Sequence, residues 1–361
     1  MRVLVLNAGS SSIKYQLIES SDGRRLAGGT IEEVTDHAAA LDSILSQLGD
    51  TTVDAVGHRV VHGGEVFTVP TLVDDEMLTT LHGLVPLAPL HNPANIAGIE
   101  AARRVWPGIP QIAVFDTAFH RTLPAYAYRY AVPVEWYERH GVRRYGFHGT
   151  SYEFVAHEAA RRLGRPLGEL DLIVAHLGNG ASITAIQGGR SIDTSMGLSP
   201  LEGLVMGTRS GDIDPSIVAH VAGATDRAFG DVLTDLNRKS GLAGLCGVSD
   251  MREVSRRAES GDPDAMLALD VFCYRVKKYI GAYVAVLGGC DALVFTGGIG
   301  EHSAVVRETA CSGLAGLGIS IDTERNRRDA EVVSTDDSQV NVLVVPTDEE
   351  RVIAEQTAAL A

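Results

Sequence analysis

The sequence predicts an α/β protein made of two similar domains. Its length of 361 residues is enough for two separate hydrophobic cores. Between Val3 and Ile18, an apolar run ends in Asn, Gly and three Ser residues and then becomes alternately apolar and polar, which is typical of a strand–turn–strand unit. Residues 172–186 repeat this pattern. The repeat indicates two similar domains that face each other, each with a Gly- and Ser-rich turn at a common cleft.

The composition is that of a compact enzyme, with 45% hydrophobic residues, 21% charged residues and 39 Gly. A net charge of −15, from 31 Lys+Arg and 46 Asp+Glu, argues against nucleic acid or an acidic membrane surface as a partner. The four cysteines form no C-x-x-C pair, so the sequence predicts reduced thiols rather than a zinc site or a disulfide framework.

Apolar runs in the chain are short. The run Val3–Leu6 is far shorter than the core of a signal peptide, and no other run approaches the length of a membrane span. We therefore expect a soluble, cytoplasmic protein.

In the first half of the chain, Gly and Pro separate the predicted elements. One helix is predicted to stop at Gly49 and another at Pro107, whereas the three prolines of residues 86–93 fix φ and remove donors, which predicts a shaped loop. Asp116 follows a buried strand, at the carboxyl end where ligands collect in open sheets. The predicted elements are strand 30–31, helix 38–48, strand 53–61, helix 79–84, helix 95–106 and strand 111–115.

The second half begins with a Tyr-rich connection at residues 126–136, which is predicted to cross between the domains. Thr150 or Ser151 is the predicted N-cap of the next helix, and residues 196–212 contain too many glycines for a helix. The further predicted elements are a helix to residue 163, the strand–turn–strand 172–186, helices 217–221 and 265–287, a strand from 292 that ends in the glycines of 297–300, strand 342–345 and a terminal helix opened by residues 348–350.

The chemistry of these segments suggests phosphate binding. Small residues let backbone N–H groups approach a ligand, and hydroxyl groups and cations add donors. Phosphoryl transfer needs positive charge around the transferred oxygens and oxygen ligands for a metal ion. The chain offers both, in three Gly-rich turns together with Lys14, Arg59, Arg209, His148, Asp116 and Glu349. Plainer explanations stay open at this point, because the first turn could be an ordinary hairpin, each arginine half of a surface ion pair, and Asp116 a turn cap.

Several familiar motifs are missing from the sequence. None of the four lysines follows a glycine, which excludes a Walker A loop, and there is no Gly-x-Ser-x-Gly elbow. Gly298-Ile299-Gly300 lacks the third glycine of a dinucleotide fingerprint, and His157-Glu158 lacks the second histidine of a zinc protease.

Six segments resemble motifs of the acetate kinase family, in the same order and over nearly the whole chain: residues 7–14, 57–64, 115–120, 145–151, 176–182 and 206–212. That family lies in the actin, Hsp70 and sugar-kinase superfamily, whose two duplicated RNase H-like domains close over ATP. The resemblance implies an actin-like ATPase fold with a cleft between an N-terminal domain, residues 1–119 plus 351–361, and a C-terminal nucleotide-binding domain, residues 120–350.

The resemblance also implies roles for individual residues. Asn7 and Glu349 would hold Mg²⁺ or Mn²⁺. The phosphates would be served by Lys14, Ser10 and Ser12. The catalytic residues would be Asp116, His148, Arg209 and Arg59, and Arg59 would also bind the substrate.

The remaining implied residues form two pockets. The methyl group of the substrate would be enclosed by Val61, Leu90 and Pro200. The nucleotide would be bound by His176, Leu177, Gly178, Asn179, Gly180, Asp250, Met251, Arg252, Gly298, Ile299, Gly300, Glu301 and His302.

The reaction implied by the resemblance is reversible transfer of the γ-phosphoryl group of ATP to acetate by direct in-line attack, giving acetyl phosphate and ADP. A carboxylic acid with a pKa of about 4 arrives ionised at pH 7 and needs no general base. We therefore expect Asp116 to orient metal, water or arginine, although an acid–base role is often described for the family. The alternatives are a propionate or butyrate kinase of the same family and an ATP-driven module like actin or Hsp70.

The chain departs from the usual family pattern in a few places. It is short for the family, Tyr152 stands where a His is common, and His302 replaces a frequent Asn. Cys246 lies in a loop, residues 240–252, that is one residue short. These departures bear on nucleotide preference. A homodimer is expected from the resemblance alone.

Overall fold

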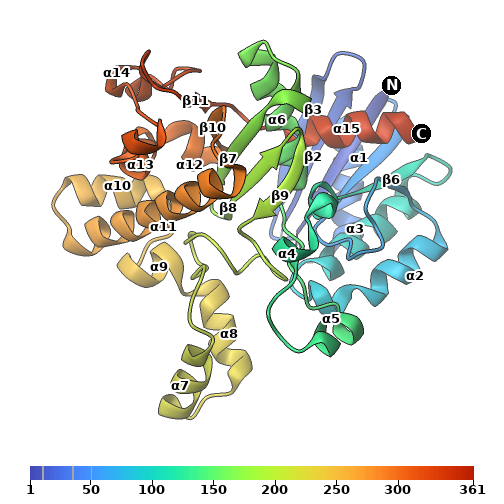
Figure 1. Cartoon of the computed structure of the whole chain (residues 1–361). Helices are drawn as coiled ribbons and strands as arrows, with labels where there is room; N and C mark the ends of the chain where they lie inside the picture. The colour runs from blue at the N-terminus through green and yellow to red at the C-terminus, as the bar shows by residue number, and fades with distance from the viewer. Residues whose placement is uncertain (10–11, 35, 50) are drawn as a thin grey trace. The chain divides into compact units, whose positions relative to one another are not determined.

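The computed structural model describes residues 1–361 except 10, 11, 35 and 50 (Figure 1). The chain divides into two compact units. The first unit comprises Met1–Arg121, Phe147–Phe154 and Asp348–Ala361, and the second comprises Thr122–Gly146 and Val155–Thr347.

The sheet of the first unit has the strand order β3-β2-β1-β4-β6-β5. Strands β1, β4 and β6 run parallel, whereas β2, β3 and β5 pair antiparallel with their neighbours. The strands are β1 Arg2–Ala8, β2 Ser12–Glu19, β3 Arg24–Glu32, β4 Ala55–Val60, β5 Thr71–Leu72 and β6 Gln111–Phe115.

Strand β1 is buried on both faces, as expected for a central strand with parallel neighbours. Its alternate residues Val3 and Val5 pack with Ile353 of helix α15, whereas Leu4 and Leu6 pack on the other face with Leu41 of helix α1. The helices are α1 His37–Leu48, α2 Asp75–Gly83, α3 Asn92–Val105 and α15 Glu349–Leu360, with 3-10 helices at Val85–Leu87 and Ala118–Thr122.

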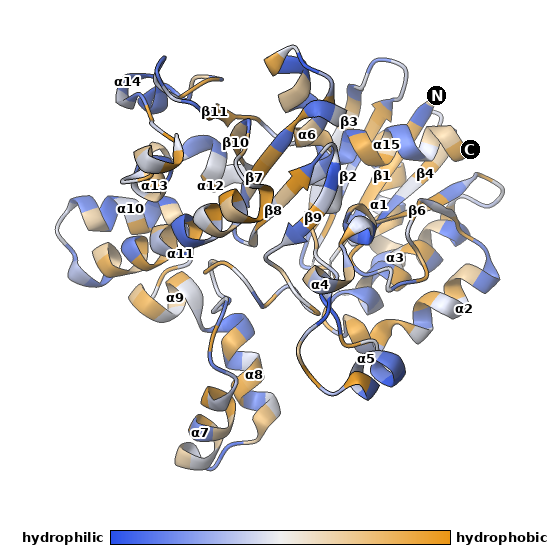
Figure 2. Ribbon diagram, in the orientation of Figure 1, coloured by the Kyte–Doolittle hydropathy of each residue, from blue (hydrophilic) through white to orange (hydrophobic). Residues whose placement is uncertain are grey.

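The sheet of the second unit has the strand order β11-β10-β7-β8-β9. Strand β10 pairs parallel with β11 and β7, whereas β8 pairs antiparallel with β7 and β9. This repeats the arrangement of β1 to β4 and β6 in the first unit. The strands are β7 Asp171–Leu177, β8 Ala181–Gln187, β9 Arg190–Thr194, β10 Ala292–Thr296 and β11 Asn341–Val344. Strands β7 and β8 are almost entirely buried, and their central residues are mostly apolar (Figure 2).

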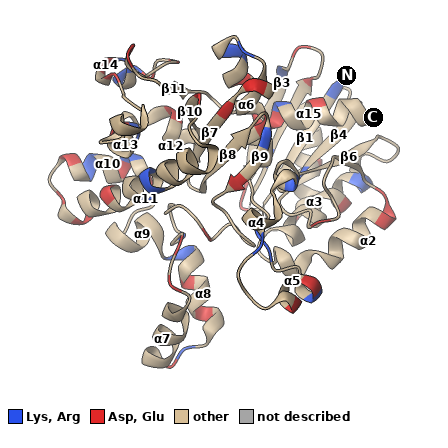
Figure 3. Ribbon diagram, in the orientation of Figure 1, with Lys and Arg blue, Asp and Glu red and all other residues tan. Residues whose placement is uncertain are grey.

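Helix α11, Pro263–Leu287, contacts β7 and β8 and turns Phe272, Val276 and Ile280 into the core. Most charged residues lie on helices and connecting segments (Figure 3). The other helices are α4 Ala125–Tyr128, α5 Val134–His140, α6 Gly149–Leu163, α7 Ser216–Thr225, α8 Phe229–Arg238, α9 Gly241–Cys246, α10 Met251–Glu259, α12 Gly297–His302, α13 Ala304–Cys311 and α14 Thr323–Arg327, with 3-10 helices at Leu167–Glu169 and Ala315–Leu317. No helix within the described residues is long and apolar enough to cross a membrane.

The predicted fold class is confirmed, since two sheets of matching strand order carry the two strand–turn–strand units. Helix α1 ends at Gly49, which has a φ of 56°, and no helix forms in 196–212. Three local predictions were wrong. Helix α6 begins at Gly149, so neither Thr150 nor Ser151 is its N-cap. The segment 86–93 is not wholly irregular, because α3 begins at Asn92 with Pro93 in its first turn. The glycines after β10 form helix α12 rather than a turn, because the carboxylate of Glu301 accepts from Gly297 N.

Candidate functional site

In the first unit, the ends of parallel strands are tied together by side chains of α3. Asn95 donates from Nδ2 to Ala8 O at 2.7 Å and accepts from Val61 N at 3.0 Å, so one side chain links the ends of β1 and β4. Asn92 makes a similar pair of bonds with the backbone of His62, at 3.0 and 3.2 Å. Asn92 and Asn95 are three positions apart and therefore lie on one face of the helix.

Arg59 and Asp116 form a bidentate ion pair at this edge, with Nε to Oδ1 at 2.9 Å and Nη2 to Oδ2 at 2.7 Å. The Asp116 side chain is 1% exposed and that of Arg59 is 20% exposed. Burial alone would lower the pKa of Arg59, but the charges of Asp116 and Glu349 outweigh it and raise the pKa. Burial raises the pKa of Asp116, against the opposing effect of Arg59. Among the described residues, Nη1 of Arg59 has no hydrogen-bond partner, so two N–H donors are left for an anion.

The start of α6 lies beside this pair. Gly149 N donates to Asp116 O at 3.0 Å, and a Cβ at Gly149 would lie 2.2 Å from that oxygen, so only glycine fits. The preceding residue, His148, adopts a left-handed φ of 59°. Glu349 Oε2 accepts from Thr150 Oγ1 at 3.1 Å and lies 3.8 Å from Arg59 Nε.

Three more predicted residues lie in the same unit. Asn7 and Lys14 are directly opposite in the β1–β2 register, so they share one face of the sheet. Lys14 forms an ion pair with Glu350 of α15. Ser12 begins β2, and its carbonyl accepts from Gly9 N at 2.8 Å, whereas Ser10 lies outside the described residues.

Of the residues predicted to enclose the methyl group, two lie in the first unit and one lies in the second. Val61 is half-buried after β4, whereas Leu90 is 50% exposed; both belong to the first unit. Pro200 belongs to the second. There it accepts at its carbonyl from Arg209 Nη1 at 3.1 Å.

Arg209 is a half-buried cation of the second unit without an acidic partner among the described residues. Within the described part of the chain, Nη1 forms hydrogen bonds to Pro200 O and, at 3.6 Å, to Met206 Sδ. Burial lowers the pKa of Arg209, because no carboxylate offsets the loss of water. A desolvated cation without a counter-ion is an anion-binding candidate.

The second unit also contains a cavity of about 820 Å³, a size that suits a small-molecule ligand. Of the predicted nucleotide-binding residues, it is lined by Gly178, Asn179, Asp250, Met251, Arg252, Gly298, Ile299 and His302. The segment around Gly207 packs closely against Asn179 of the cavity wall. Gly207 N donates to Asn179 O at 3.0 Å, and a Cβ at Gly207 would lie 2.0 Å from Asn179 Oδ1.

Five other predicted nucleotide-binding residues do not line this cavity. His176 and Leu177 are buried in β7. The carboxylate of Glu301 accepts from Gly297 N at 2.9 Å and from Thr347 N at 3.2 Å. The remaining two are Gly180 and Gly300.

Sequence reasoning missed several lining residues. Ser255 and Glu259 follow Met251 at intervals of four, so they lie on the same face of α10. That spacing is the signal that could have found them. Ser249, Ser303, Ala304 and Val305 also line the cavity, and no local motif marks them.

Arg307 was also missed. This side chain is 0% exposed, and Nη1 donates to Gly300 O at 2.8 Å and Glu301 O at 2.9 Å. The same guanidinium donates to Asn326 Oδ1 at 2.7 Å and pairs with Asp329 at 2.5 Å. Arg307 thus caps the carboxyl end of α12, which lines the cavity.

The residues predicted to hold a metal offer oxygen atoms, the ligands that Mg²⁺ and Mn²⁺ prefer. Within the described part of the chain, no group of three or more His, Cys, Asp or Glu side chains could hold a metal ion. In phosphoryl-transfer enzymes, Mg²⁺ is held by one or two protein oxygens together with substrate phosphates and water. The amide of Asn7 and the carboxylate of Glu349 fit such a site by their chemistry.

Comparisons with known proteins agree with one another. A model of the Acetokinase family matches residues 29–355. A relative from Pseudarthrobacter chlorophenolicus, named acetate kinase, is 54% identical, with 100% of this chain and 99% of the relative covered. The crystal structure of Porphyromonas gingivalis acetate kinase has a TM-score of 0.95 and 42% identity and covers 99% of both chains. A propionate kinase from Francisella tularensis has a TM-score of 0.96 and 42% identity and covers 100% of both chains.

Proposed function

Because this chain belongs to the acetokinase family, we propose that it transfers the γ-phosphoryl group of ATP to acetate, reversibly, giving acetyl phosphate and ADP. The structural observation that carries this proposal is Arg209, a half-buried guanidinium without an acidic partner in the described residues. Such a cation is suited to an anionic ligand, and both acetate and ATP are anions.

In the proposed reaction, an acetate oxygen attacks the γ-phosphorus. The bond from that phosphorus to the β,γ-bridging oxygen breaks, and its electron pair leaves on ADP. Acetate is ionised at neutral pH, so no proton has to be removed before attack. The principal barrier is then the approach of two anions, which positioned cations lower.

The first unit would supply the acceptor side of this chemistry. Asp116 fixes Arg59 through Nε and Nη2, and the donors on Nη1 are left for the acetate carboxylate or the transferred phosphoryl group. In this proposal Asp116 is an orienting group rather than a base. Lys14, Ser10 and Ser12 would bind phosphate oxygens, and His148 would stabilise charge that develops in the transition state.

The second unit would supply the nucleotide site. Its cavity is lined by Asn179, by the start of α10 and by α12, and we assign adenosine binding to it. Arg209 would stabilise charge on the transferred phosphoryl group. We also propose domain boundaries at residues 1–119 plus 351–361 and at 120–350, which differ from the two compact units in where residues 120–121, 147–154 and 348–350 belong.

Asn7 and Glu349 would hold Mg²⁺ or Mn²⁺ together with ATP phosphates. When bound, the ion would neutralise charge on the β- and γ-phosphates. On the protein side of this proposed site, Arg59 pairs with Asp116 and Thr150 donates to Glu349.

The acceptor could also be propionate, since the propionate kinase from Francisella tularensis is as similar in sequence as the acetate kinase from Porphyromonas gingivalis, at 42% identity each. One methylene changes specificity by only about 1–3 kcal/mol. We favour acetate because of the size of the Val61 and Pro200 side chains, which the family resemblance assigns to the methyl group. Comparing kcat/KM for acetate, propionate and butyrate tests this preference.

We also propose a cytoplasmic homodimer, on the basis of family membership and of ATP as co-substrate. A stable monomer in analytical ultracentrifugation would contradict the dimer.

The main test is a hydroxamate assay with ATP, Mg²⁺ and acetate, in which hydroxylamine traps acetyl phosphate. We expect product that depends on both ATP and acetate. Folded protein that forms no product, with either acetate or propionate, would refute the proposed function.

A further inference from the structure

We infer that Arg144 and Tyr130 act as positioning residues that keep Arg209 free of a competing carboxylate. The inference rests on the proposed function, because it requires Arg209 to meet an anionic substrate. Arg209 lies in the loop formed by residues 195–212, here called the arginine loop. The observation that carries the inference is how the acidic side chains of this loop are held.

The arginine loop contains two acidic residues, Glu202 and Asp212. Neither forms an ion pair with Arg209 in the described structure, although both share its loop. An acid so near in sequence is the obvious counter-ion for a half-buried guanidinium. Something must therefore hold both acids elsewhere.

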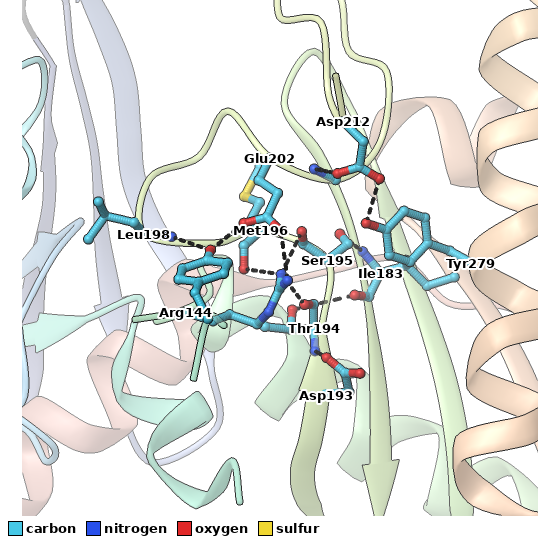
Figure 4. Close-up of polar contacts among 12 residues, drawn as sticks. Arg144, Ile183, Asp193, Thr194, Ser195, Met196, Leu198, Glu202, Asp212 and Tyr279 are labelled. Carbon is cyan, nitrogen blue, oxygen red and sulfur yellow. Dashed lines mark hydrogen bonds and ion pairs between the residues drawn. The ribbon is translucent and has the colours of Figure 1, made fainter. Parts of the chain in front are cut away.

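Arg144 holds Glu202. Its Nη2 donates to Glu202 Oε1 at 2.7 Å (Figure 4). The other Glu202 oxygen, Oε2, accepts from Tyr130 OH, and Tyr130 OH accepts from Leu198 N at 3.1 Å. Both oxygens of the carboxylate are thus occupied by groups from outside the loop.

Arg144 is itself fixed to the start of the loop. Its Nη1 donates to Thr194 O at 2.8 Å, Ser195 O at 3.0 Å and Met196 O at 3.2 Å (Figure 4). A Cβ at Gly197 would lie 1.7 Å from Glu202 Oε2, so the pair of Glu202 with Tyr130 requires glycine at position 197.

The second acid is held at the other end of the loop. Asp212 Oδ1 accepts from Gly203 N at 2.8 Å, and Oδ2 accepts from Tyr279 OH at 2.8 Å (Figure 4). Arg275 adds an ion pair at 3.2 Å. Both residues come from α11, whereas Arg144 and Tyr130 come from segments before β7.

The arginine loop contains neither helix nor strand, so these side-chain contacts determine its shape. If Arg144 is removed, Glu202 loses its ion-pair partner, and Arg209 is the one Lys or Arg within the same loop. A Glu202–Arg209 pair would then compete with the anionic substrates. Glu202 and Asp212 would thus compete with the anionic substrates for Arg209 if they were not paired. Arg144 and Tyr130 bind Glu202, and other partners bind Asp212.

The test is a rescue experiment on the full chain. We expect Arg144→Met to lower kcat/KM for acetate about tenfold or more. In Arg144→Met/Glu202→Gln, most of that loss should be regained, because the amide carries no charge to compete for Arg209. A double variant as impaired as Arg144→Met, or worse, would overturn the inference, because a purely structural role predicts no rescue.

The matched control is Arg162→Met. Arg162 also pairs with a glutamate, Glu158 at 2.8 Å, and donates to a backbone carbonyl, Val344 O at 2.9 Å, but lies on α6 away from the arginine loop in sequence. Its kcat/KM should stay within about twofold of wild type. Circular dichroism establishes that each variant is folded.

If Arg144→Met does not fold, Tyr130→Phe and Tyr130→Phe/Glu202→Gln are used in place of the two Arg144 variants. The double variant should regain most of the kcat/KM lost in Tyr130→Phe, and a double variant that regains none of it would overturn the inference. An Arg209→Ala variant separates the two proposals. A wild-type protein without kinase activity, or a near-normal kcat in Arg209→Ala, would refute the proposed function. An inactive Arg209→Ala beside a fully active Arg144→Met would refute only the present inference.

Discussion

Arg59 and Asp116 are 57 residues apart in sequence and meet as a bidentate pair, with Nε–Oδ1 at 2.9 Å and Nη2–Oδ2 at 2.7 Å. Arg209 stands in contrast to Arg59, because it has no acidic partner among the described residues. One arginine is therefore oriented by a buried carboxylate, and the other is oriented through backbone and sulfur contacts of its own loop. This difference leads to distinct expectations for the two.

Replacing Arg59 with lysine should lower kcat/KM for acetate about a hundredfold. The lysine ammonium group keeps the positive charge, but it has one nitrogen. It cannot form two fixed hydrogen bonds to Asp116 and also offer a separate nitrogen to the substrate. Steady-state hydroxamate assays measure this loss. Arg103→Lys is the control, because Arg103 forms an exposed pair with Asp75 at 2.8 Å in the same unit. Equal activities in the two variants would contradict the role of Arg59.

Gly149→Ala should destabilise the protein by about 1–3 kcal/mol and reduce kcat, because the added Cβ would lie 2.2 Å from Asp116 O and force that backbone to move. Urea denaturation gives the stability change. Gly83→Ala is the control, with nothing within 4 Å of the added Cβ. A Gly149→Ala protein as stable and active as Gly83→Ala would show that this close approach is unimportant.

Arg307→Leu should weaken nucleotide binding and leave KM for acetate nearly unchanged. The substitution removes donors from Gly300 O and Glu301 O at the end of α12, and each buried acceptor left without a partner costs about 1–3 kcal/mol. Calorimetric titration with a non-hydrolysable ATP analogue measures the affinity. Arg327→Leu, an exposed arginine of α14 paired with Glu324, should bind like wild type. An unchanged Kd in a folded Arg307→Leu protein would disprove the expectation.

The stability of the protein should fall as the pH drops from 6.5 to 4. Burial lowers the pKa of His58 from 6.5 to about 4, with Gln111 opposing the shift through a bond of 2.8 Å to Nε2. Between pH 6.5 and 4, the unfolded chain therefore takes up a proton at His58 and the folded protein does not. The contribution of neutral, buried His58 to the free energy of unfolding is full above pH 6.5 and is lost by pH 4. It amounts to at most about 3 kcal/mol.

His58→Asn isolates that contribution, because asparagine does not titrate in this range. The free energy of unfolding, measured by urea denaturation at a series of pH values, should vary less between pH 6.5 and 4 in the variant than in the wild type. Identical pH profiles for the two proteins would rule out His58 as the source.

Glu349→Gln should raise the Mg²⁺ concentration needed for half-maximal activity, since a neutral amide oxygen attracts a hard cation less than a carboxylate does. Titration of MgCl₂ at fixed ATP measures the change. Glu355→Gln, which removes the acid of a half-exposed pair with Arg351 on the same helix, is the control. The same Mg²⁺ requirement in both variants would exclude Glu349 as a metal ligand.

Much of the fold follows from the sequence because its signals are local. The alternation of apolar residues in 3–18 and 172–186 predicts two strand–turn–strand units, and the antiparallel strand pair of each is present. Gly49 ends α1 because glycine accepts the positive φ of 56° there. The many glycines of 196–212 predict the absence of a helix, which the structure confirms.

The amino-acid sequence alone thus predicts the order and type of the principal elements and many of the residues at their ends. The side-chain partners become visible only in the folded chain: Asn95 joins Ala8 to Val61, Arg59 pairs with Asp116, and Arg144 pairs with Glu202. Period and turn chemistry act between neighbours a few positions apart, so they can be read from the chain. Contacts across tens of residues depend on strand order and on which donors are left after burial, and no local pattern encodes either.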